Sequence, residues 1–114
     1  AIRFEQTGGP EVLRWQEVDL GELAPGEARV RYTAVGVNFI DTYHRSGLYP
    51  VPLPSGLGME GAGVVEAVAA DVRDLRPGDR VAYATGPLGA YAERQHLPAA
   101  RLVKIPPEVT DAQA

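Results

Sequence analysis

The sequence predicts a turn-rich, mainly β domain with only short helices, and three observations favour this fold class. The 13 glycines and 10 prolines make up about a fifth of the 114 residues, compared with an average share of about 12%. Apolar residues occur in short runs, as in antiparallel sheets, and not in the long amphipathic stretches of a helical bundle. The length is that of a single domain, which suffices to bury a core.

Strands are expected to dominate the first third of the chain. The first predicted strand spans Val12–Val18, with Trp15 at its centre. After a turn at Ala24–Glu27, the segment Ala28–Ala34 alternates in polarity, which is typical of a half-buried strand. One of its faces carries Val30, Tyr32 and Ala34, and the other carries Arg29, Arg31 and Thr33.

A short helix is predicted after this strand. Asn38 is a favourable N-cap residue, and Gly47 is a favourable C-terminal stop. Between them, Phe39, Ile40 and Tyr43 share one face at helical spacing.

The rest of the chain is predicted to return to extended structure. Three closely spaced prolines predict a loop that cannot join a sheet interior: Pro50, Pro52 and Pro54. A long strand is expected from Gly61, where β-branched residues accumulate. Three shorter strands are predicted after it, at Arg80–Ala84, Tyr91–His96 and Leu102–Ile105.

The last residues have the form of a helix start. Thr110–Gln113 matches the Thr-x-x-Gln capping box, which opens a helix. We therefore expect the chain to be a fragment or an excised domain of a longer protein.

Composition argues against several function classes. The net charge is −4, with both signs interspersed, whereas a nucleic-acid surface needs clustered cations. The most apolar region, Gly61–Ala70, is interrupted by Glu66 and is far shorter than the ~20 residues of a membrane helix. The absence of cysteine rules out disulfides and cysteine-ligated zinc, and it fits a reducing cytosol. A cytoplasmic protein without nucleic-acid or membrane partners is expected.

Five motifs carry a resemblance to a known family. In chain order they are GGPEVL (8–13), NFIDTYHRSGLYP (38–50), PSGLGMEGAGVV (54–65), PGDRV (77–81) and GAYAE (89–93). The chain resembles the N-terminal GroES-like domain of the medium-chain dehydrogenase/reductase superfamily, specifically its zinc-free quinone oxidoreductase branch. PGDRV is common to the whole superfamily, whereas NFIDTY followed by RSGLYP points to bacterial-type NADPH:quinone oxidoreductases.

This resemblance implies a fold, a cofactor and a substrate. Residues 1–114 would form the N-terminal part of a catalytic domain, a largely antiparallel and partly open β-barrel. A nucleotide-binding domain, absent from this chain, would bind most of the NADPH. The full-length protein would reduce quinones and would be a homodimer. The 114-residue chain alone is expected neither to turn over quinone nor to bind NADPH tightly.

The resemblance also implies that the chain uses no metal. In zinc alcohol dehydrogenases of the superfamily, a cysteine and a histidine occupy the positions of Asn38 and Met59. Zinc prefers thiolate, imidazole or carboxylate ligands, and a carboxamide and a thioether are none of these. Glu60, which lies behind the metal in those relatives, is expected to be structural and to need an arginine or backbone N–H partner.

The main functional hypothesis concerns the helix that begins after Asn38. By resemblance, Asn38 and Tyr43 are the catalytic candidates. The cofactor-binding candidates are Asn38, Phe39, Ile40, Asp41, Thr42 and Tyr43, which would line the nicotinamide end of the cofactor. A purely structural interpretation would instead make Asn38 a helix cap, Asp41 a solvated acid and Tyr43 a core residue.

Other motifs are expected to be structural. Gly56–Gly61 formally matches G-x-G-x-x-G, but a proline loop precedes it and a strand follows. A dinucleotide site needs a helix N-terminus at this point. His44 and His96 have no companions at metal-ligand spacing and are expected to be exposed or hydrogen-bonded. Arg45 could balance cofactor phosphate charge or simply lie at the surface.

Quinone reduction is consistent with the missing metal. Alcohol oxidation needs a base or Lewis acid to remove the hydroxyl proton, whereas a quinone is already a strong electron acceptor. Its reduction needs mainly proximity, orientation and a hydrogen-bond donor at the oxygen. Two alternatives remain, a zinc-free enone or alkenal reductase and a non-catalytic barrel module such as a co-chaperonin subunit or a lens-crystallin-like protein.

Overall fold

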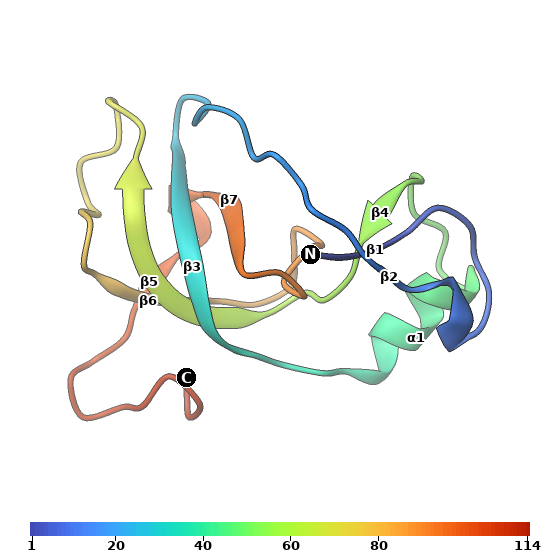
Figure 1. Ribbon diagram of the computed structural model, residues 1–114. Helices are drawn as coiled ribbons and strands as arrows, with labels where there is room; N and C mark the ends of the chain where they lie inside the picture. Colours follow the sequence, from blue (N-terminus) through green and yellow to red (C-terminus); the bar gives the residue numbers. More distant parts are fainter.

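The computed structural model describes residues 1–114 and contains two antiparallel sheets and a single α-helix, which lies beside the smaller sheet (Figure 1). The larger sheet is formed, in spatial order, by β7 (Arg94–Pro98), β3 (Glu27–Val35), β5 (Gly61–Val68), β6 (Arg80–Tyr83) and β8 (Val103–Lys104). The smaller sheet is formed by β2 (Arg14–Trp15), β1 (Ile2–Phe4) and β4 (Ser55–Gly56). The two sheets do not close on each other, which agrees with the predicted mainly β, partly open barrel.

The central pair of the larger sheet, β3 and β5, forms the framework of the main core. The predicted alternation in β3 is confirmed, because Ala28 and Val30 are buried while Arg31 and Thr33 are exposed. Burying these apolar side chains removes them from water and stabilises the fold. The main core consists of Ala28, Val30, Val65, Leu75, Val81, Tyr83, Ala90 and Leu97.

A second, smaller core lies under the smaller sheet. Phe4, Val12 and Leu57 form it. The predicted strand at Val12–Val18 is largely wrong, since only Arg14 and Trp15 pair with β1. The reason is local, because Pro10 begins the 3₁₀ helix η1 (Pro10–Val12), and this turn directs Val12 into the small core. Proline fixes φ at a value suited to the start of a helix.

The predicted strand at Tyr91–His96 is also shifted, to Arg94–Pro98. Tyr91 makes its backbone hydrogen bonds elsewhere, donating to the Leu57 carbonyl at 2.9 Å and accepting from Ile2 N–H at 2.7 Å. The chain therefore crosses from the smaller sheet to the larger one before it pairs with β3. This crossing fixes Tyr91 next to the small core.

The single α-helix, α1 (Phe39–Ser46), has the predicted limits. Asn38 is its N-cap residue, and Gly47 ends it in the left-handed conformation with φ +87°, which glycine adopts without a steric penalty. Figure 1 shows α1 at the far end of the connection that leaves β3, beside β1 and β2. No helix of the structure has the length and apolar character needed to cross a membrane.

The last segment of the chain is tied to the larger sheet. Asp111 accepts hydrogen bonds from Arg80 Nη2 and from Thr33 Oγ1, both at 2.6 Å. These hydrogen bonds, from Thr33 and from Arg80, lower the pKa of the Asp111 carboxyl. The predicted capping contact is also present, because the Gln113 side-chain oxygen accepts from the Thr110 N–H at 3.0 Å.

Candidate functional site

Pairing between β3 and β5 fixes the start of the candidate site. Val35, the last residue of β3, faces Gly61, the first residue of β5. The ladder continues one step further, since Gly36 N–H donates to the Glu60 carbonyl at 3.4 Å. The two connections that carry Asn38 and Met59 therefore leave the sheet side by side.

The structure distributes the predicted site residues over both sides of α1. Phe39 is 83% exposed and Tyr43 is 36% exposed, and Thr42 is also exposed, with its hydroxyl donating to the Phe39 carbonyl at 2.6 Å. Asn38 and Ile40 are half-buried. Five of the six residues thus keep some exposed surface near the amino end of α1, and the interpretation of Tyr43 as a core residue does not hold.

Asp41 is the exception, because it is only 3% exposed. Its Oδ2 accepts from the Asn38 backbone N–H at 2.9 Å and from the Tyr91 hydroxyl at 2.6 Å, while its Oδ1 is buried without a partner. The interpretation of Asp41 as a solvated acid is wrong. Because its carboxylate faces inward, Asp41 is better placed to stabilise α1 than to contact a cofactor directly.

An aromatic pair extends the exposed side of α1. The Tyr49 ring lies edge-on to the Tyr43 ring, with centroids 5.3 Å apart, and the Tyr49 N–H donates to the Tyr43 carbonyl at 3.1 Å. Such pairs hold both rings in a defined orientation. Tyr49 was not among the predicted site residues, although its position just after the Gly47 helix stop could have indicated that the chain turns back onto Tyr43.

The histidines and Arg45 are not arranged for catalysis. His44 is 8% exposed and its Nδ1 has no partner, so it is neither exposed nor fully hydrogen-bonded, contrary to expectation. His96 accepts from Arg29 Nε at 3.1 Å, as expected of a satisfied histidine. Arg45 Nε donates to the Gly8 carbonyl at 3.2 Å, which ties α1 to the N-terminal segment.

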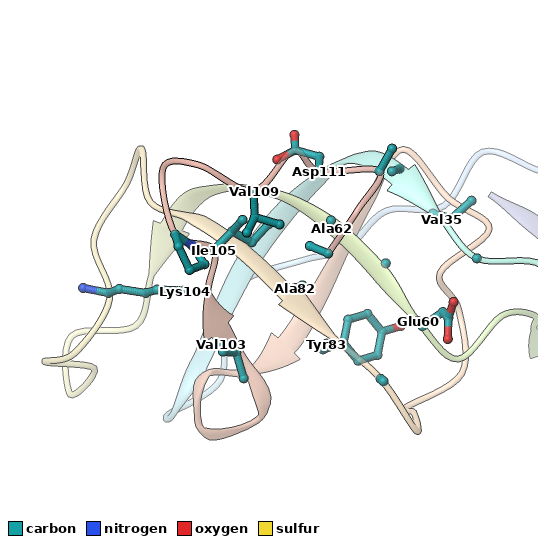
Figure 2. A pocket seen from close by; sticks show the side chains of 17 residues that line it. Val35, Glu60, Ala62, Ala82, Tyr83, Val103, Lys104, Ile105, Val109 and Asp111 are labelled. Atoms are coloured by element: carbon teal, nitrogen blue, oxygen red, sulfur yellow. The ribbon is translucent and has the colours of Figure 1, made fainter.

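A cleft of about 440 Å³ adjoins this region, but none of residues 38–43 lines it (Figure 2). Small residues of the larger sheet are among those that line it: Ala34, Ala62 and Ala82. Figure 2 shows Tyr83 and Glu60 together at one end and Lys104 pointing away at the other. We place the candidate site on α1, because the exposed aromatic rings and the half-buried Asn38 amide there suit a flat polar ring, whereas the cleft is lined mainly by apolar residues.

Glu60 lacks the predicted arginine or backbone N–H partner. No arginine pairs with its carboxylate, and no backbone N–H donates to it. It packs against Gly36, where any Cβ would overlap the carboxylate. Burial raises the pKa of the Tyr83 hydroxyl, and the negative charge of Glu60 adds to this effect. Glu60 itself is partly exposed to solvent, which explains why its unpaired charge is tolerated.

The side chains near Asn38 do not fit a zinc centre. Asn38 offers a carboxamide and Met59 a thioether, neither of which is among the usual zinc ligands. No group of three or more histidine, aspartate or glutamate side chains comes together in metal-binding proximity anywhere in the structure. The donor set at this position is therefore unsuited to zinc.

The glycine motif at Gly56–Gly61 is structural. Gly56 belongs to β4, Gly61 begins β5, and no helix follows the motif. Gly58 has a φ of +91°, and a Cβ at this residue would lie 2.6 Å from the Tyr91 ring. These glycines thus serve a turn and a close approach, as predicted, and do not form a dinucleotide phosphate site.

Comparison with known proteins gives a consistent result. The family model of the alcohol dehydrogenase GroES-like domain matches residues 24–107. A quinone oxidoreductase of Pseudomonas aeruginosa is 57% identical over 99% of this chain and 35% of its own length. A 2-haloacrylate reductase of a Burkholderia species is 46% identical over 96% of this chain and 34% of its own length.

Solved structures show the same likeness. The quinone oxidoreductase of Escherichia coli, crystallised with NADPH, superimposes with a TM-score of 0.92 at 46% identity, over 96% of this chain and 34% of that chain. The chain spans about a third of the length of the relatives it matches. The GroES-like resemblance and the likeness to quinone oxidoreductases are confirmed.

Proposed function

Because this chain belongs to the family of alcohol dehydrogenase GroES-like domains, we propose that it is the catalytic-domain portion of an NADPH-dependent quinone oxidoreductase that uses no metal. The observation that carries the proposal is the 57% identity to a quinone oxidoreductase along almost the whole chain. A structural neighbour crystallised with NADPH supports the choice of cofactor.

The residues on the exposed side of α1 fit the nicotinamide end of the cofactor. Tyr43 offers a ring face for packing and a hydroxyl that can donate to a ribose or substrate oxygen. Asn38 offers an amide that can donate and accept, which suits a carbonyl oxygen. In this proposal Phe39, Ile40 and Thr42 line the same end, and Asp41 holds the helix from inside. NADPH, when bound, supplies the hydride.

The chain's own contribution is to orient the substrate and stabilise the developing charge. A quinone that gains a hydride becomes a hydroquinone anion, which takes one proton from water to become hydroquinone. A hydrogen bond from Asn38 or Tyr43 to the quinone oxygen stabilises that anion as it forms. No base and no Lewis acid is needed, which is consistent with a donor set that does not fit zinc.

A second candidate is supported by the relative that acts on an activated alkene. The 2-haloacrylate reductase is 46% identical to this chain. Hydride addition to a carbon–carbon double bond next to a carbonyl group can use the same amide and hydroxyl donors. An enone or haloacrylate reductase is therefore the alternative function.

Substrate competition separates the two functions. We expect the full-length protein to reduce 1,4-benzoquinone with a kcat/KM at least about tenfold above its values for an enone and for 2-chloroacrylate, a difference of about 1.4 kcal/mol in transition-state stabilisation. The assay follows NADPH oxidation with each acceptor at matched concentrations. A higher kcat/KM for the enone or the haloacrylate would replace the proposed function by the alternative, and no turnover of any acceptor would favour a non-catalytic module.

A further inference from the structure

A residue far from α1 in sequence holds the buried carboxylate of that helix. Tyr91, in the connection before β7, donates its hydroxyl to Asp41 Oδ2 at 2.6 Å. Hydrogen bonds to a charged acceptor are stronger than neutral ones. Since Asp41 Oδ1 has no partner, the hydrogen bonds at Oδ2 are what compensate for burying this charge.

The same oxygen fixes the start of α1. Asp41 Oδ2 accepts from the Asn38 backbone N–H at 2.9 Å, and the Asp41 N–H donates to the Asn38 carbonyl at 3.0 Å. This arrangement satisfies backbone groups that the first helical turn leaves unpaired. The orientation of Asn38 at the start of the helix therefore depends on the position of the Asp41 carboxylate.

Tyr91 is itself held firmly. Its ring packs on the small core and on Gly58, and its N–H donates to the Leu57 carbonyl at 2.9 Å. Burial raises the pKa of its hydroxyl, and the hydrogen bond to Asp41 adds to the rise. The phenol therefore stays protonated, and remains a donor, throughout the neutral pH range.

We propose that Tyr91 is a positioning residue for the reaction. Its hydroxyl, acting through Asp41, orients Asn38 and the first turn of α1 toward the nicotinamide of the cofactor. This proposal rests on the proposed function, because it concerns the same site. Tyr91 itself does not touch the substrate in this account, so its effect is on how well the cofactor is held.

The test is the substitution Tyr91→Phe in the full-length protein, which removes the hydroxyl and keeps the packed ring. We expect the Kd and the KM for NADPH to rise about five- to thirtyfold, with kcat changed less than about threefold, because a hydrogen bond to a charged acceptor is lost. Fluorescence titration gives the Kd, and steady-state kinetics give the other two. In an Asp41→Asn background the acceptor is neutral. There, the increase in the Kd for NADPH caused by Tyr91→Phe should be at least about twofold smaller than in the wild type.

A matched control is Tyr32→Phe. Tyr32 also donates a 2.6 Å hydrogen bond, to Gln95 Oε1, but within the larger sheet and away from α1. Both variants should remain folded, with Tyr91→Phe losing at least as much thermal stability as Tyr32→Phe, while only Tyr91→Phe should change the Kd for NADPH. An active wild type whose Tyr91→Phe and Tyr32→Phe variants bind NADPH equally well would overturn this inference alone. A wild type that binds no NADPH would overturn the proposed function, and the inference with it.

Discussion

Replacing Gly63 by alanine is expected to destabilise the folded domain by about 2–4 kcal/mol. Gly63 is buried in β5 opposite Tyr32, at an irregularity where the pairing register of β3 and β5 shifts. A Cβ at this position would overlap the Arg31 carbonyl oxygen and lie 2.9 Å from the Tyr32 Cα. Both neighbours are backbone atoms of the central strand pair, so the clash cannot be relieved by rotating a side chain.

The measurement is thermal melting of the full-length protein and its variant, in which Gly63→Ala should lower Tm by at least about 5 °C. Gly9→Ala is the matched control. A Cβ at Gly9 would also meet a neighbour too closely, but that neighbour is the carboxylate end of the exposed Glu11 side chain, which can rotate away into solvent. The control should change Tm by less than about 2 °C. Equal and small effects of both substitutions would show that β3 and β5 do not approach as closely as described.

Removing the Tyr43 side chain is expected to cause the largest loss of function. Tyr43→Ala should lower kcat/KM about 10- to 100-fold, mainly through a higher KM for NADPH, because both the packed ring and one hydrogen bond are lost. Tyr43→Phe keeps the ring and should lower kcat/KM only about 2- to 13-fold. Steady-state kinetics of the full-length variants with NADPH and a benzoquinone give both values.

Stability must be measured on the same samples. Because Tyr43 is 36% exposed, Tyr43→Ala should leave the melting temperature within a few degrees of the wild type. Trp15→Ala removes another large exposed ring, on β2, and should leave the kinetics unchanged. An unaltered kcat/KM in a folded Tyr43→Ala variant would remove Tyr43 from the site.

The elements that the sequence predicted best are those whose signals are local. Asn38 and Gly47 mark the ends of α1 because capping depends on residues within one turn. The alternation of Ala28–Ala34 was sufficient for β3, because Ala28 and Val30 on one face are buried whereas Arg31 and Thr33 on the other face are exposed. The position of the candidate site came from the family resemblance, since neither composition nor periodicity indicates a nicotinamide site.

The elements that the sequence missed depend on distant partners. Asp41 is buried because Tyr91, fifty residues further along the chain, donates to its carboxylate. The start of β7 is displaced because Tyr91 pairs with Leu57 and Ile2 before the chain reaches β3. Local propensity contains no information on such contacts, which form only when the two sheets pack. The aromatic contact of Tyr49 with Tyr43 likewise requires the turn after Gly47.

The central claim is that this domain supports quinone reduction without a metal. Its most direct test is NADPH-dependent reduction of 1,4-benzoquinone by the full-length protein, purified without an affinity tag and dialysed against a strong chelator, with zinc content determined on the same sample. We expect no stoichiometric zinc and the same kcat/KM before and after chelation. Activity that disappears with the chelator and returns on addition of zinc would contradict it, as would the absence of any quinone-dependent oxidation of NADPH.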